Sequence, residues 1–190
     1  NGAALTGCPV RVDMPAYLSK HDIVYRTPAY EGYEGLPLGN GNMGGMLWCI
    51  ERGVHIQINK TDTWDGTQSR VLRSCASIEL DFGAPCFEWT LLKDFEGRIS
   101  LHDAEASIRS TTPFARTELR SYVTASENMW LLECTVHGSG ELSEGAATTV
   151  SLERWGSRDF RGWYNRHYQK EAEEGLGSAS VGITGDTVHL

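Results

Sequence analysis

Nearly every periodic segment of this chain alternates apolar and polar residues with a period of two. Residues 54–59 read Val-His-Ile-Gln-Ile-Asn, and residues 78–82 repeat the pattern before the breaker Gly83-Ala84-Pro85. Such alternation is typical of strands with one buried face. Further strands are predicted, between short turns, at 87–92, 98–101, 106–109, 117–123, 130–136 and 149–152. No segment before residue 155 carries a helical apolar stripe over three turns, so the pattern predicts an all-β fold, an antiparallel two-sheet β-sandwich.

A glycine-rich segment at residues 34–48 leads into one of these apolar runs. Its glycines match G-x-G-x-x-G, the pattern that cradles the pyrophosphate of a dinucleotide between a strand and a helix. Here Pro37 stands where that strand would end, and two glycines stand where the helix would begin. Residues 46–50 and 54–58 flank a short turn instead, which predicts a hairpin. We therefore expect no cofactor, and assign a structural turn to Gly39, Asn40, Gly41, Asn42 and Gly44.

Length and charge narrow the class of protein. The 190 residues suit one domain. A net charge of −8, from 25 acidic and 17 basic residues, argues against a nucleic-acid partner. No apolar run is long enough to predict a membrane span. We treat residues 1–21 as an N-terminal segment and residues 22–190 as the sandwich domain.

The five cysteines and six histidines show no metal-binding spacing, so no metal site is expected. Cys49 and Cys134 lie in apolar strand patterns, where a free cysteine usually acts as a small buried apolar residue. Residues 5–8, Leu-Thr-Gly-Cys, look like a bacterial lipoprotein cleavage box. On that hint we expect an exported bacterial protein, in the periplasm, on the cell surface or secreted.

The segment 154–168 breaks the strand pattern because it is dense in aromatic residues and arginines. Trp, Tyr and Arg dominate the hot spots of interfaces, and aromatic rings also stack on sugars. The sequence leaves three interpretations open: a surface that packs on another domain, a carbohydrate contact, and a surface loop. The candidate contact residues are Trp155, Trp163, Tyr164 and Arg166. Residues 187–190 begin another alternating strand, from which we expect the chain to be a fragment of a larger protein.

Several of these motifs together resemble a known family. Residues 36–44 (Leu-Pro-Leu-Gly-Asn-Gly-Asn-Met-Gly), the strand end 56–59 and the loop 61–66 resemble the start of the N-terminal β-sandwich of family 95 glycoside hydrolases, the α-L-fucosidase type. Residues 98–126 and 150–154 also look like that domain, so the resemblance spans about residues 22–155. Lys60 replaces the acid found after the asparagine in typical fucosidases. The chain is thus more similar to a related, uncharacterised branch with the same sandwich.

The resemblance implies a supersandwich-like domain without catalytic residues of its own. In such enzymes the general acid and base lie on a downstream (α/α) barrel, against which the sandwich packs and whose sugar site its loops help to wall. The expected partners are that barrel and an oligosaccharide. Two alternatives stay open: a free-standing carbohydrate-binding module, and a structural or dimerisation domain without a ligand.

A carboxylate pair after the hairpin is the nearest approach to glycosidase chemistry in the chain itself. Asp62 and Asp65 flank Trp64, and glycoside hydrolysis uses two carboxyl groups, one of them held protonated. Aspartates in a loop after a strand more often cap turns. We therefore predict no catalytic residue, but retain Asp62, Trp64 and Asp65 as candidates for contacting carbohydrate.

Overall fold

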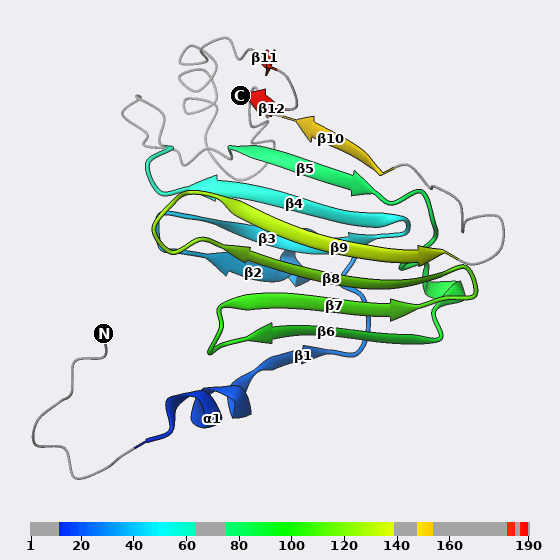
Figure 1. The fold of residues 1–190 in the computed structure, drawn as a ribbon, viewed down its shortest axis with the longest axis horizontal. Helices are drawn as coiled ribbons and strands as arrows, with labels where there is room; N and C mark the ends of the chain where they lie inside the picture. Colours follow the sequence, from blue (N-terminus) through cyan, green and yellow to red (C-terminus); the bar gives the residue numbers. More distant parts are fainter. Residues whose placement is uncertain (1–11, 64–74, 139–147, 154–181, 185–186, 190) are drawn as a thin grey trace, which may run out of the picture.

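The computed structural model describes residues 12–63, 75–138, 148–153, 182–184 and 187–189. Its strands form two five-stranded antiparallel sheets, which confirms the predicted sandwich (Figure 1). The first sheet, sheet A, has the order β1 (Ile23–Tyr25), β6 (Asp94–Ser100), β7 (Glu105–Thr111), β8 (Ala115–Val123), β9 (Trp130–Gly138). The second, sheet B, has the order β10 (Thr149–Glu153), β5 (Ala76–Asp81), β4 (Gly53–Lys60), β3 (Met43–Ile50), β2 (Leu36–Gly39).

Short elements complete the described fold. The helix α1 (Met14–Leu18) is capped by Asp13, whose side chain accepts a hydrogen bond from the Ala16 amide. The 3-10 turns are η1 (Ser19–His21), η2 (Gly32–Glu34) and η3 (Trp89–Leu91). The strands β11 (Gly182–Thr184) and β12 (Thr187–His189) pair with each other.

The predicted hairpin is confirmed and forms the centre of sheet B. β3 and β4 pair from Met43↔Lys60 to Ile50↔Gly53, joined by the turn Glu51-Arg52. A strand rather than a helix thus follows the glycine-rich segment. This arrangement excludes the dinucleotide loop, which needs a helix N-terminus at that point.

The core lies between the sheets, where the predicted alternation places every second side chain. In β8 the inward residues are buried and their neighbours are mostly exposed. The largest fully buried side chains are Leu36, Leu47, Val54, Phe87, Ile108 and Leu119, with Cys49, Cys86, Thr117 and Ser121. Cys49 is therefore a buried apolar residue, as predicted, whereas Cys134 is half-buried at the edge strand β9.

The two sheets are offset rather than stacked strand on strand. β2, the edge of sheet B, lies against β7 and β8 of sheet A. A Cβ atom built on Gly45 of β3 would lie 3.1 Å from the Trp130 ring of β9. The remaining strands of sheet B therefore extend beyond β9, and Figure 1 shows β5 and β10 above it.

The predicted strand at residues 87–92 is wrong. Those residues form a loop that includes η3. Phe87 is fully buried, and its amide donates to the Glu51 carbonyl at 3.0 Å, whereas Trp89 is 65% exposed. Phe87 therefore fills the core from a loop. The alternating apolar residues Phe87, Trp89 and Leu91 do not form a strand.

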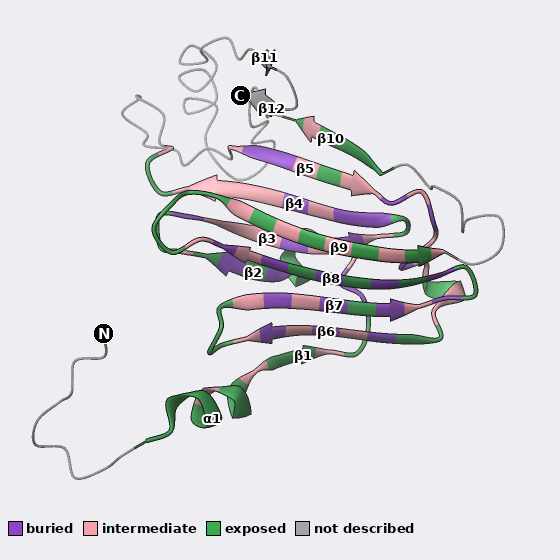
Figure 2. Ribbon diagram, viewed as in Figure 1, coloured by how far each residue is buried: buried purple, intermediate pink, exposed green. Residues whose placement is uncertain are grey.

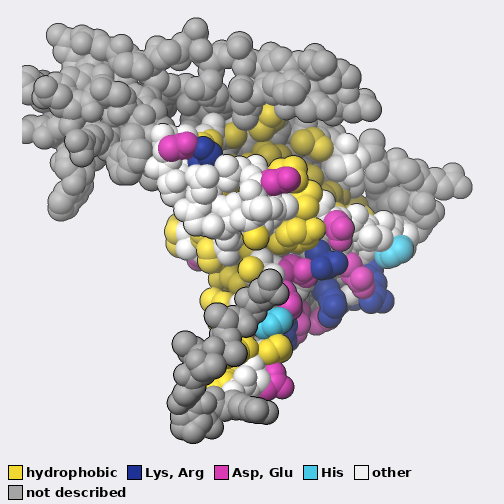
Figure 3. Space-filling view, turned by 60° about the vertical axis from the view of Figure 1, so that its left-hand side comes forward, with side chains coloured by type: hydrophobic (Ala, Val, Ile, Leu, Met, Phe, Trp, Pro, Cys, Tyr) yellow, Lys and Arg dark blue, Asp and Glu magenta, His cyan; other side chains and the backbone are white. Residues whose placement is uncertain are grey.

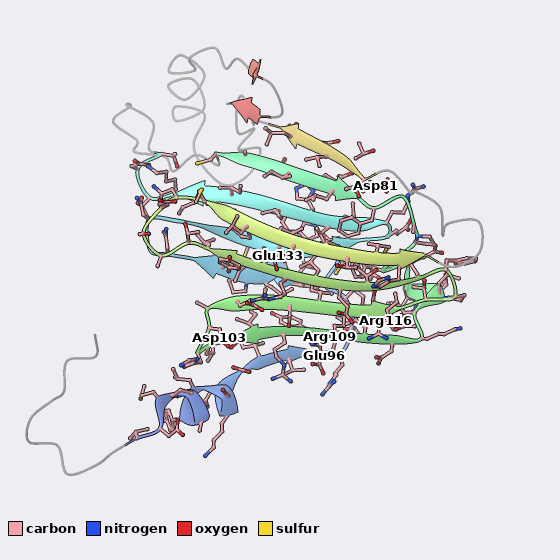
Figure 4. All side chains as sticks on the ribbon, in the orientation of Figure 1. Asp81, Glu96, Asp103, Arg109, Arg116 and Glu133 are labelled. Carbon is pink, nitrogen blue, oxygen red and sulfur yellow. The ribbon has the colours of Figure 1, made fainter. Side chains whose placement is uncertain are left out.

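The outer face of sheet A is a solvent-facing array of opposite charges. Arg120 binds Glu105 through two hydrogen bonds of 2.8 and 2.5 Å, and Arg26 pairs with Glu96 at 2.7 Å. Figure 4 labels Glu96, Arg109, Arg116 and Glu133 on this sheet. Such exposed pairs add little stability, but they keep this face hydrated.

Candidate functional site

The glycine-asparagine segment forms the turn between β2 and β3. The Asn40 side-chain oxygen accepts hydrogen bonds from the amides of Asn42, at 2.9 Å, and Met43, at 2.8 Å. Gly41 has a φ of 90°, a left-handed conformation that favours glycine. The Asn40 side chain and the left-handed Gly41 therefore close the turn.

Asn40 also joins this turn to the opposite sheet. Its side-chain amide donates to the carbonyl of Thr124 at 2.9 Å and to that of Glu127 at 3.2 Å. Both carbonyls belong to the turn between β8 and β9. One side chain therefore uses its acceptor within its own turn and its donor across the sandwich.

Asn42 makes the corresponding connection to the loop that follows β4. Its carbonyl accepts from the Thr61 amide at 2.9 Å, and its side-chain oxygen accepts from the Thr61 hydroxyl at 3.1 Å. The Thr63 hydroxyl donates to the Lys60 carbonyl at 2.7 Å. Three connections, the β2–β3 turn, the β8–β9 turn and residues 60–63, thus meet at one end of the sandwich, which we call the loop end.

The loop end presents a mixed surface. Figure 3 brings it toward the viewer and shows backbone and uncharged polar groups beside patches of hydrophobic side chains and a few charged groups. A surface of mixed hydrophobic and polar groups suits contact with another domain or with a sugar better than contact with a highly charged ligand.

Asp62 lies at this end, and its ionisation argues against an acid role. Its carboxylate pairs with the Lys60 ammonium and is 64% exposed. The hydrogen bond from Lys60 lowers the pKa of the Asp62 carboxyl below its ordinary value. A general acid of a glycosidase needs a raised pKa, the opposite direction.

The remaining predicted contact residues lie outside the described residues. They are Trp64, Asp65, Trp155, Trp163, Tyr164 and Arg166. The Leu5–Cys8 segment lies outside them as well. Of the predicted site residues, the structure therefore brings together Asn40, Asn42 and the Asp62 loop.

The outer face of sheet B carries a cluster that the sequence analysis missed. Trp48 and His55 are paired residues of β3 and β4, and their rings stack with centroids 4.2 Å apart and 19° between planes. His55 Nδ1 lies 3.8 Å from a carboxylate oxygen of Glu79 on β5. This pair could have been predicted from the sequence. A hairpin turn at Glu51-Arg52 fixes the register in which Trp48 pairs with His55.

Within the described ranges, no group of three or more His, Cys, Asp or Glu side chains could hold a metal ion. No helix among the described residues is long and apolar enough to cross a membrane.

The chain was compared with known families and proteins. Residues 23–80, which run from the first residue of β1 into β5, match the family model described as glycosyl hydrolase family 65, N-terminal domain. No curated protein matches the chain. The matched region is therefore similar to a glycoside hydrolase N-terminal β-sandwich, and the family named is 65 rather than 95.

Proposed function

We propose, from the similarity of residues 23–80 to a glycosyl hydrolase N-terminal domain, that this chain is the non-catalytic N-terminal sandwich of a glycoside hydrolase. Its role is to pack on a catalytic (α/α) barrel and to help shape the sugar site. The motifs at 36–44 and 56–66 make the family 95 fucosidase type, or a branch related to it, our choice of enzyme. The observation that carries the proposal is the family match across β1 to β5.

The chemistry of the described carboxylates supports a non-catalytic role. The strand residues Glu96, Glu105 and Asp81 are engaged in ion pairs with Arg26, Arg120 and Arg52. A glycosidase needs one carboxyl held protonated, and Asp62, the candidate nearest a loop, has its pKa shifted downward.

The geometry of the loop end supports a packing role. Asn40 and Asn42 fix three connections relative to one another, so the end of the sandwich is held in shape before any partner arrives. A preformed surface loses less conformational entropy on docking than a set of independent loops. The loop end is therefore the surface that we assign to the barrel.

The test compares this chain with the product of its complete gene. Both are assayed against a panel of aryl glycosides that includes an α-L-fucoside. We expect turnover only for a product that includes a barrel. Hydrolysis by residues 1–190 alone, lost on Asp62→Asn, would contradict the proposal.

A free-standing carbohydrate-binding module is the second candidate. It is favoured by Trp89, which is 65% exposed on η3, since an exposed indole face can stack on a pyranose ring. Adjacent polar groups are available, because the Thr90 hydroxyl donates to the Glu88 carboxylate at 2.9 Å. Calorimetric titration with plant and mucin oligosaccharides decides this candidate, with Trp89→Ala abolishing the heats if it is correct.

A further inference from the structure

Asn40 is followed directly by a glycine, which makes the pair chemically labile. In an Asn-Gly pair the backbone nitrogen of the glycine can attack the side-chain carbonyl carbon of the asparagine, because glycine has no side chain to block the approach. The other described asparagines precede larger residues: Asn42 and Asn128 precede methionine, and Asn59 precedes lysine. Asn40 is therefore the described asparagine best suited to this reaction.

The fold restrains the reacting carbon of Asn40 from both sides. The side-chain oxygen accepts hydrogen bonds from the amides of Asn42 and Met43, at 2.9 and 2.8 Å. The side-chain nitrogen donates to the carbonyls of Thr124 and Glu127, at 2.9 and 3.2 Å. These bonds require a planar amide group, whereas attack makes its carbon tetrahedral. The reaction therefore requires that some of these bonds break first.

The attacking nitrogen, in contrast, is not restrained. The Gly41 amide has no hydrogen-bond partner among the described residues, and a Cβ built on this glycine would have no atom within 4 Å. The turn that Asn40 reaches, between β8 and β9, is exposed at residues 125–129 (Figure 2). Surface turns open locally at a lower free energy than the strands they join. Opening of the loop end is therefore the step that would release Asn40.

We propose that Asn40 is a modification site, which the closed loop end protects and which reacts when the loop end opens. In the open state the Gly41 nitrogen loses its proton and forms a bond to Cγ of Asn40. The bond from Cγ to the side-chain nitrogen breaks, and that nitrogen leaves with the proton as ammonia, so the product is a cyclic imide. Water then breaks one of the two ring C–N bonds. Breaking the bond to Cγ gives aspartate, and breaking the bond to the Asn40 backbone carbonyl carbon gives isoaspartate.

The change is irreversible for the structure as well as for the side chain. Both products have lost the nitrogen that donates to Thr124 and Glu127, and both place a carboxylate near those carbonyl oxygens. Isoaspartate also adds a carbon atom to the backbone of the turn. A chain that has reacted therefore does not close its loop end as before.

Incubation of the whole chain at one mildly alkaline pH, followed by peptide mass spectrometry, tests the protection. Asn40 should exchange its NH₂ for OH at least about tenfold more slowly in buffer than in denaturant, because reaction in the folded state needs a prior opening. In denaturant Asn40 should react before Asn42 and Asn59, with the residue assigned by fragmentation. Equal rates at Asn40 in buffer and denaturant, or equal rates at Asn40 and Asn42 in denaturant, would overturn the proposal.

A variant that loosens the β8–β9 turn tests the role of opening. The Thr124 hydroxyl donates to the Glu127 carbonyl within that turn. Thr124→Val should therefore speed the reaction of Asn40 in buffer at least about threefold, and should leave its rate in denaturant unchanged. Thr135→Val, the same change at an exposed position of β9, is the matched control and should react like the wild type. Thermal melts establish that both variants fold, and a Thr124→Val chain with the wild-type rate in buffer would contradict control by opening.

Hydrogen exchange of the reacted chain tests the structural consequence. Anion exchange separates that chain, because it carries an additional negative charge. Peptides that cover residues 36–47 and 121–131 should exchange faster than in the unreacted chain, whereas residues 105–111 of β7 should exchange equally. Identical exchange at the loop end in both forms would show that the modification leaves the turn closed, and would overturn the proposed irreversibility.

Discussion

The Asn40 side-chain amide donates a hydrogen bond of 2.9 Å to the carbonyl of Thr124, a residue 84 positions away in the chain. The bond ties the β2–β3 turn of one sheet to the β8–β9 turn of the other. The same side chain closes its own turn through its oxygen. Asn40 therefore couples a local conformation to the closure of the sandwich at the loop end.

Replacing Asn40 with Asp should separate these two roles. Aspartate keeps the acceptor for the Asn42 and Met43 amides but loses the donor to Thr124 and Glu127. The Thr124 and Glu127 carbonyls then lose their hydrogen-bond donor and face a carboxylate instead. We therefore expect a loss of about 1–3 kcal/mol in the free energy of unfolding. Denaturant unfolding measures it. Asn128→Asp is the matched control, because its side-chain oxygen is 3.5 Å from Asn40, and we expect a change below about 0.5 kcal/mol.

Two glycines of the same segment should respond differently to alanine. Gly41 has a φ of 90° but no atom within 4 Å of an added Cβ, so Gly41→Ala should cost only backbone strain, about 1–2 kcal/mol. A Cβ on Gly45 would lie 1.9 Å from the Gln57 carbonyl oxygen. Gly45→Ala should therefore destabilise more than Gly41→Ala, and equal melting temperatures would contradict this account. Gly41→Asn offers a further check, because asparagine tolerates the left-handed region and should recover part of the loss.

Thr117 should be better replaced by valine than by serine. Its hydroxyl is fully buried and, within the described part of the chain, has at most the weakly polar Cys86 thiol beside it rather than a well-formed hydrogen bond. Thr117→Val removes this poorly satisfied polar atom at nearly constant shape, so we expect stability to stay equal or to rise by about 1 kcal/mol. Thr117→Ser keeps the hydroxyl and removes a methyl group, and should lower the free energy of unfolding. A valine variant less stable than the serine variant would contradict the burial argument.

The thiols should differ in reactivity and make stability depend on pH. Burial raises the pKa of Cys134 from an ordinary 9.0 to about 12, and burial also raises the pKa of Cys49 and of Cys86. The neutral thiol is thus favoured in the folded state. The stabilisation is complete below the ordinary thiol pKa and is lost as pH rises from about 9 toward 12.

Native alkylation followed by peptide mass spectrometry checks the thiol prediction. Cys75, which is partly exposed directly before β5, should be labelled before Cys49 and Cys86. Labelling of Cys49 should require denaturant. Early modification of Cys49 in the folded protein would contradict its burial.

Local pattern predicted most of the strands, because alternation reports one buried face directly. The hairpin of β3 and β4 follows from residues 54–59 and the breaker before them. The same alternation wrongly predicted a strand at Phe87, Trp89 and Leu91. Apolar spacing does not distinguish a strand from a loop that fills the core with one aromatic ring. The strand β2 was not predicted, because Pro37 interrupts its pattern. Proline is tolerated there because β2 is an edge strand, in which one backbone N–H can be missing.

The candidate site was less predictable than the fold. The turn residues Asn40 and Asn42 follow from local turn chemistry. Their partners Thr124 and Thr61 do not, because those contacts arise only once both sheets are assembled. The Trp48–His55 stack could have been predicted from the hairpin register alone. The exposure of Trp89 could have been predicted only if its segment had been recognised as a loop.

The placement of Pro37 has a consequence for self-assembly. On the side of the molecule formed by β1 and β2, sheet A ends in a strand of three residues and sheet B ends in a strand interrupted by proline. Among the described strands, neither offers a continuous template for strand addition. Pairing of another chain with this flank of the sandwich is therefore disfavoured, which protects this flank against intermolecular sheet growth.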